Sequence, residues 1–172
     1  MNDRIRIFQP LHALTGACVF ALLACGVASA SALEPAVESQ LIANRVVTEA
    51  GAEVFKPSDK ANPGDVIEYR ARYINKGLVG VAALAATIPV PPGTEYRSGT
   101  ARPIGALATA DGINFSAIPL KRSLRTPDGK TRDELVPTAE YRALRWELGA
   151  FQAGADAVVS LRVRVTPTQP SR

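Results

Sequence analysis

The chain has 172 residues, 47% of them apolar, which is enough for one packed domain and excludes wholesale disorder. The formal net charge of +4 is mildly basic and gives no nucleic-acid-binding signature. The only His and both Cys, which are His12, Cys18 and Cys25, lie near the N-terminus. The rest of the chain therefore lacks the side chains for Ser-His-Asp or Cys-His catalysis, Cys/His zinc sites, haem ligation and iron–sulfur clusters.

Residues 1–32 have the pattern of a secretory signal peptide. A weakly positive start precedes an uncharged, mostly apolar stretch over residues 13–28, and small-x-small sites follow, the second of them Ala30-Ser-Ala32. We predict cleavage between Ala32 and Leu33. The mature chain would then carry a net charge of +3, contain no cysteine and rely on its core rather than on disulfides.

Two alternatives remain open for this segment. The sequence Leu22-Leu-Ala-Cys25 resembles a bacterial lipobox, which predicts a lipoprotein anchored through Cys25. An uncleaved anchor is the other alternative, but the apolar stretch of roughly 12–16 residues is short of the ~20 that span a bilayer. We therefore predict an exported protein, periplasmic or extracellular, with no transmembrane span in the mature chain.

The mature chain opens with a predicted flexible leader over residues 33–40, and a strand rich in β-formers is predicted over residues 41–49. Gly51 and the polar segment 56–60 interrupt it. A turn is predicted at Asn62-Pro-Gly-Asp65, because Pro presets φ and Gly supplies a positive φ.

Residues 66–75 alternate between apolar and charged side chains, which predicts a half-buried strand. We expect Ile67, Tyr69, Ala71 and Tyr73 to face inward and Glu68, Arg70 and Arg72 to face outward. Further strands are predicted over residues 81–88 and 94–101, each ended by Pro and Gly.

The stretch from Ile104 to Glu140 is less regular. A short strand is predicted within residues 110–115, with 116–124 as its pairing partner, and Pro127-Asp-Gly-Lys130 predicts a tight turn. One helical turn is predicted within residues 133–140.

Two more alternating strands follow, over residues 141–148 and 157–165, before a frayed tail over residues 167–172. Trp146 shares a strand face with Leu144 and Leu148, so we predict that it lies in the core. No apolar helical pattern of substantial length occurs in the mature chain. Short strands separated by Pro/Gly turns predict an all-β fold, an antiparallel immunoglobulin-like β-sandwich of about seven to nine strands over residues 41–166.

The order of turns and strands resembles the bacterial conserved repeat domain, also called domain of unknown function eleven. The resemblance covers roughly residues 41–165 and rests on the order of its motifs. It implies an immunoglobulin-like sandwich that is exported or surface-exposed and has no established catalytic residues. The matching segments are Asn62-Pro-Gly-Asp-Val-Ile-Glu-Tyr69, Tyr73-Ile-Asn-Lys-Gly77, Ile88-Pro-Val-Pro-Pro-Gly-Thr-Glu-Tyr96, Leu144-Arg-Trp-Glu-Leu148 and Gln152-Ala-Gly154.

The chain departs from this family in two respects. Many members carry an Asp shortly before the Pro of the third turn, where this chain has Ala86-Thr87-Ile88-Pro89. Only one copy of the module is present. The single-copy secreted members carry an insertion between the third turn and the Trp strand, which the segments Asp111-Gly112 and Pro127-Asp-Gly-Lys130 resemble.

Three hypotheses assign a functional role to residues that ordinary structural roles also explain. Asp133-Glu134 is an acidic pair that could serve a carboxylate-dependent hydrolase, but solvated loop charges are commoner. The segment 128–134 supplies acids but does not match a calcium-binding loop, because Lys130 and Arg132 lie among them. An aromatic sugar-binding platform is less favoured than core packing. Its candidates are Tyr69, Tyr73, Tyr96, Tyr141 and Trp146.

One basic stretch, residues 121–132, is the best candidate for contact with an anionic partner, and a solvated loop is the alternative. Its cations are Lys121, Arg122, Arg125, Lys130 and Arg132. We therefore predict a non-catalytic exported module that acts through an envelope protein or an anionic envelope polymer. No catalytic, cofactor or metal residue is predicted. The alternative is an exported carboxylate-dependent hydrolase.

Overall fold

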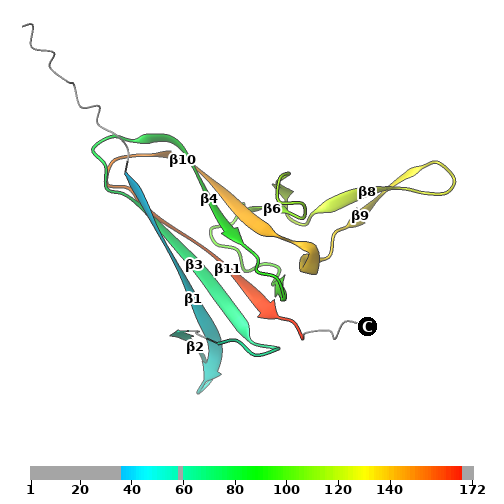
Figure 1. Cartoon of the computed structure of the whole chain (residues 1–172), viewed down its shortest axis with the longest axis horizontal. Helices are drawn as coiled ribbons and strands as arrows, with labels where there is room; N and C mark the ends of the chain where they lie inside the picture. Colours follow the sequence, from blue (N-terminus) through cyan, green and yellow to red (C-terminus); the bar gives the residue numbers. More distant parts are fainter. Residues whose placement is uncertain (1–35, 58–59, 168–172) are drawn as a thin grey trace, which may run out of the picture. The chain divides into compact units, whose positions relative to one another are not determined.

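The computed structural model describes residues 36–57 and 60–167, which fall within a single unit of the chain (Figure 1). All pairings between its strands are antiparallel, and the two main sheets form an all-β sandwich, which confirms the predicted fold class. The signal peptide over residues 1–32, its cleavage site at Ala32 and Leu33, and the lipobox Cys25 lie outside the described residues, as do residues 168–172 of the tail. The elements are β1 (Val37–Glu49), β2 (Ala52–Pro57), β3 (Val66–Asn75), β4 (Val81–Pro89), β5 (Thr94–Tyr96), β6 (Leu107–Thr109), β7 (Ser116–Ala117), β8 (Lys121–Arg125), β9 (Thr131–Leu135), the 3-10 turn η1 (Thr138–Glu140), β10 (Ala143–Phe151) and β11 (Asp156–Val165).

The first sheet has the strand order β2-β1-β3-β11-β5, and the second has the order β4-β10-β6-β7. Strands β8 and β9 form a separate two-stranded sheet, which extends beyond β6 in Figure 1. The two strands with the clearest alternation, predicted over residues 66–75 and 157–165, are the adjacent inner strands β3 and β11 of the first sheet.

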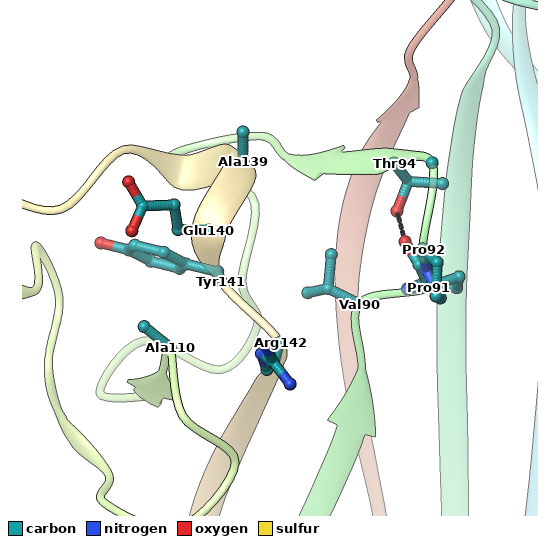
Figure 2. A pocket seen from close by; sticks show the side chains of 10 residues that line it. Val90, Pro91, Pro92, Thr94, Ala110, Ala139, Glu140, Tyr141 and Arg142 are labelled. Atoms are coloured by element: carbon teal, nitrogen blue, oxygen red, sulfur yellow. Dashed lines mark hydrogen bonds between the residues drawn. The ribbon is translucent and has the colours of Figure 1, made fainter. Parts of the chain in front are cut away.

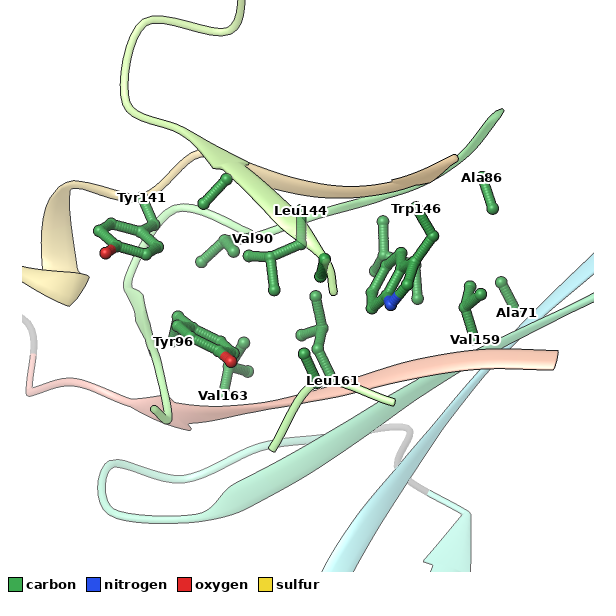
Figure 3. Close-up of a cluster of buried hydrophobic side chains, with 14 of the residues drawn as sticks. Ala71, Ala86, Val90, Tyr96, Tyr141, Leu144, Trp146, Val159, Leu161 and Val163 are labelled. Carbon is green, nitrogen blue, oxygen red and sulfur yellow. The ribbon is translucent and has the colours of Figure 1, made fainter. Parts of the chain in front are cut away.

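The core lies between the inward faces of the two sheets (Figure 3). Period-two alternation places every second side chain of β3, β4, β10 and β11 there, as predicted from the sequence. Trp146 is only 2% exposed, and its indole Nε1 donates a hydrogen bond to the Pro103 carbonyl at 2.8 Å. The buried residues of these strands are Ile67, Ala71, Ala86, Ile88, Leu144, Trp146, Val159, Leu161 and Val163.

The tyrosines are core residues rather than a surface platform. Tyr96 and Tyr141 are buried and stack with ring centroids 5.8 Å apart at 13°. Tyr69 and Tyr73 pack partly buried against the same core. The sugar-stacking alternative is therefore wrong for this set of residues, because their ring faces pack against protein.

One charged residue of β3 was expected on the solvent side but is buried. Glu68 is 5% exposed and accepts hydrogen bonds from Arg162 Nε at 3.0 Å and from Arg70 at 2.9 Å. Arg162 also binds both carboxylate oxygens of Glu53 on β2, and its guanidinium lies 5.7 Å from the Phe55 ring. The β1–β2 hairpin thus covers part of the outer face of the first sheet, and the buried carboxylate is stabilised by two arginines.

The N-terminal prediction needs two corrections. Strand β1 begins at Val37 and pairs with β3 from the first residue, so the leader predicted over residues 33–40 is wrong for Val37–Gln40. Strand β2 was not expected from the sequence. Ala50 and Gly51 have φ of 51° and 82°, which is the geometry of a two-residue hairpin turn whose backbone twist matches the paired strands.

Asn75 is the last residue of β3 and lies next to the loop that follows β10. Its side chain is fully buried, and its Nδ2 donates to the carbonyls of Val79, Phe151 and Gln152 at 2.9, 3.2 and 3.1 Å. Its Oδ1 accepts a hydrogen bond from Gly77 N at 3.0 Å. One amide therefore joins the end of β3 to the segments before β4 and after β10, beside the backbone hydrogen bonds that Asn75 makes with Gly154 and Ala155.

Candidate functional site

The candidate site is built by the segment 110–142, inserted between β6 and β10. Its base is tied to the core, because Leu120 N donates to the Tyr141 hydroxyl at 2.8 Å and Val136 N donates to the Leu120 carbonyl at 2.9 Å. Leu120 and Val136 are both buried. The segment thus carries the β8–β9 hairpin on a fixed base.

Residues 121–132, the basic part of the stretch that was expected to be irregular, are mostly regular. Lys121–Arg125 pairs residue by residue with Thr131–Leu135, so most of the stretch is a β-hairpin. The pairing predicted between residues 110–115 and 116–124 is wrong, because Ser116 and Ala117 pair with β6. The predicted turn at Pro127–Lys130 is confirmed. It closes with Thr126 N donating to the Lys130 carbonyl at 2.8 Å, and Gly129 has a φ of 80°. The predicted helical turn over residues 133–140 is reduced to η1, Thr138–Glu140.

The five predicted cations do not form one cluster. The register places Lys121 and Arg125 on one face of the hairpin and Arg122 and Arg132 on the other, with Lys130 beside the turn. Within the part of the chain that the structure describes, no carboxylate pairs with Lys121, Arg125 or Arg132. These three cations are exposed and available for contact.

Arg122 and Lys130 are instead engaged by acids of the same segment. Arg122 donates to Glu134 at 3.2 Å and to Glu140 at 2.8 Å, and these contacts raise its pKa above the ordinary value for arginine. Lys130 lies 3.3 Å from Asp128. Both side chains therefore form ion pairs within the segment, Arg122 across the hairpin and to η1, and Lys130 at the turn.

The acidic side chains of the hairpin bind other side chains of the same hairpin. Asp133 accepts a hydrogen bond from Ser123 Oγ at 2.8 Å on one face, while Glu134 faces Arg122 on the other. Asp128 binds Thr126 and Lys130. In residues 36–57 and 60–167 no group of three or more His, Cys, Asp or Glu is placed to hold a metal ion.

Two hollows flank η1 at the base of the hairpin. One has a volume of about 590 Å³ and lies against the Pro91-Pro92 turn (Figure 2), with Tyr141 and Arg142 on its opposite side. The other, of about 280 Å³, is lined by Asp111, Lys121 and Arg122 among others. Glu140 lines both, and its carboxylate binds Arg122. The two carboxylates that line the smaller hollow are both engaged, because Asp111 accepts hydrogen bonds from Asn114 and Glu140 accepts one from Arg122.

Asp111 organises the loop between β6 and β7. Its Oδ1 accepts hydrogen bonds from Ile113 N, Asn114 N and Thr109 Oγ1, each at 2.8 Å, and Asn114 Nδ2 donates to Oδ2 at 2.7 Å. The backbone hydrogen bonds from Ile113 and Asn114, followed by the side-chain donors, hold the pKa of Asp111 far below its ordinary value of 3.8. The dipeptide Asp111-Gly112 is typical of a turn, so the sequence indicated a turn at this loop.

The Asp111→Asn substitution is expected to lower the melting temperature at neutral pH, because it removes a charge that four donors stabilise. Since the folded-state pKa of Asp111 is depressed, its stabilisation is complete above 3.8 and is lost as the pH falls below that value. Thermal unfolding of both proteins across this range should show the difference shrinking in acid. A difference that stays constant down to strongly acidic pH would contradict this assignment.

Comparisons with protein-family models, curated proteins and solved structures gave no match to this chain. The resemblance to the conserved repeat domain therefore remains a prediction. In the described part of the chain, no helix has the length and apolar character needed to cross a membrane.

Proposed function

We propose that the chain is an exported, non-catalytic module of the bacterial cell envelope that binds an anionic partner, protein or polymer, through the β8–β9 hairpin. The resemblance to the conserved repeat domain is part of this proposal and supplies the expectation of surface exposure. Export is supported by the charged start, apolar stretch and small-residue sites of residues 1–32.

The single observation that carries the proposal is that two of the five hairpin cations have carboxylate partners and three have none among the described residues. Glu134 and Asp128 are used by Arg122 and Lys130, which leaves Lys121, Arg125 and Arg132 exposed without a carboxylate partner among the described residues. Two of them lie on one face and one on the other. A phosphate- or carboxylate-bearing chain on one face would neutralise Lys121 and Arg125, and a chain that also passes around the edge of the hairpin would reach Arg132. Salt would weaken that contact.

A non-catalytic role is supported by how the acids are used. No His or Cys follows Cys25. Glu68, Glu134 and Glu140 are each bound to arginine, and Asp111 is held ionised by four donors. A carboxyl group that serves as general acid needs a raised pKa, which arginine partners and hydrogen-bond donors oppose.

The test is salt elution from phosphocellulose. A variant with Lys121→Glu, Arg125→Glu and Arg132→Glu is expected to elute at clearly lower salt than the wild type. The charge-matched control carries Arg97→Glu, Arg142→Glu and Arg164→Glu, three exposed arginines outside the hairpin that no described carboxylate pairs with. Equal elution of the two folded variants would mean that only net charge matters and would remove the hairpin as the binding element.

A further inference from the structure

An apolar hollow lies at the open seam of the sandwich, away from the β8–β9 hairpin. It is lined by Tyr96 of β5 in the first sheet, Leu107 and Ala117 of the second sheet, and the chain segment that crosses between them. Its volume is about 510 Å³, within the range of pockets that hold small ligands. The edge strands here, β5 and β7, have only three and two residues, so the seam is left uncovered.

The walls of the hollow favour an apolar group. Its lining includes the apolar residues Ala101, Ala106, Leu107 and Ile118. Ile104, which also lines it, is 89% exposed. A ligand that covers these groups removes apolar surface from water, which is the main favourable term in binding.

The Tyr96 hydroxyl makes no hydrogen bond to any of the described residues. Tyr96 as a whole is 2% exposed and lines the hollow, but its hydroxyl oxygen is not fully buried, so it meets solvent at the wall. A hydroxyl that is open to solvent and has no protein partner can donate to a ligand atom in the hollow. The stacking of Tyr96 on Tyr141 fixes the ring, so the hydroxyl is a positioned donor for a ligand atom.

The positively charged side chain of Arg102 lines the same hollow. Arg102 uses one guanidinium nitrogen, Nη1, to donate to the carbonyls of Gly99 and Ala101, each at 2.8 Å. No carboxylate in the described part of the chain pairs with it, so its remaining N–H groups are available. Charge-assisted hydrogen bonds from arginine match a carboxylate well.

The geometry points to a binding site for a small amphiphile with an apolar chain and one carboxylate. The chain occupies the apolar hollow, and the carboxylate accepts hydrogen bonds from the Tyr96 hydroxyl and the Arg102 guanidinium. This site goes beyond the hairpin contact and does not depend on it.

Decanoate is the probe, and Trp146 is a built-in reporter. The indole of Trp146 donates to the Pro103 carbonyl, and Pro103 lies between Arg102 and Ile104 of the hollow. Titration should give a saturable change in Trp146 emission and in the amide resonances of residues 99–107, with a Kd on the order of 1 mM or below. Decanol, which has the chain but not the charge, should bind about tenfold more weakly.

Three variants separate the contributions. Tyr96→Phe keeps the ring and its stacking and should weaken decanoate binding about tenfold, as should Arg102→Gln. Ala117→Phe should fill the exposed end of the hollow and abolish binding, whereas Ala85→Phe on β4 should bind like the wild type, as should the hairpin variant with Lys121→Glu, Arg125→Glu and Arg132→Glu. Absence of saturable binding to the folded wild type, or equal binding by the Tyr96→Phe, Arg102→Gln and Ala117→Phe variants, would overturn the site.

Discussion

Replacing Trp146 by alanine is expected to lower the free energy of unfolding by roughly 3–5 kcal/mol, the range for removing a large aromatic side chain from a packed core. The ring lies between the two sheets and is 2% exposed. Its neighbours come from both sheets, so the cavity cannot close without moving strands that are held by hydrogen bonds on both sides (Figure 3). Denaturant unfolding followed by circular dichroism measures the loss.

Trp146→Phe is the control for the ring. It keeps an aromatic group in the core but removes the Nε1 hydrogen bond to the Pro103 carbonyl, so it should cost much less than alanine. Because Trp146 is the only Trp of the chain, wild-type emission reports its burial directly. Emission at the wavelength of free tryptophan in water, together with an unchanged alanine variant, would contradict a core position.

Asn75→Ala is expected to cost roughly 3 kcal/mol, because it leaves several buried backbone groups without a partner at once. The carbonyls of Val79 and Phe151 would lose this side-chain donor and Gly77 N would lose its acceptor, whereas the Gln152 carbonyl would keep the hydrogen bond from Ala155 N. The effect should appear as an early denaturant midpoint with an unchanged slope.

Two further variants test whether loss of the Asn75 amide causes this destabilisation. Asn75→Asp keeps the shape but turns carboxylate oxygens toward the three carbonyls, so it should destabilise at least as much as alanine at neutral pH. Asn44→Ala, on the half-buried face of β1, should stay within about 0.5 kcal/mol of the wild type. Similar midpoints for Asn44→Ala and Asn75→Ala would show that the buried amide does not hold the loops.

The elements that the sequence predicted well are those whose pattern is local. Alternation in Val66–Asn75 and Ala157–Val165 reports the face of a strand directly, so their inward residues were identified without knowing which strands pair. Trp146 was assigned to the core on the same grounds. The Asn-Pro-Gly-Asp turn before β3 and the Pro127–Lys130 turn follow from backbone preferences of single residues.

The features that the sequence did not predict depend on contacts between distant segments. Glu68 lies at a polar position of its strand pattern, and its burial depends on distant residues. Arg162 binds it from β11, and β2 brings Glu53 and Phe55 to Arg162. The basic stretch has no clear period two, and its pairing with Thr131–Leu135 becomes evident only in the fold. The apolar hollow at the open seam of the sandwich is lined by residues of β5, β6 and β7 and of a connecting loop, and no sequence motif marks it.

The central claim is that the β8–β9 hairpin makes the contact with an anionic partner, and mapping by nuclear magnetic resonance tests it most directly. Isotope-labelled mature protein is titrated with inorganic polyphosphate at low salt, and the amide resonances are followed. We expect the largest shifts to fall within Lys121–Leu135, to centre on Lys121, Arg125 and Arg132, and to vanish as salt is added. Shifts confined to the outer face of the first sheet, with the hairpin unchanged, would contradict the account.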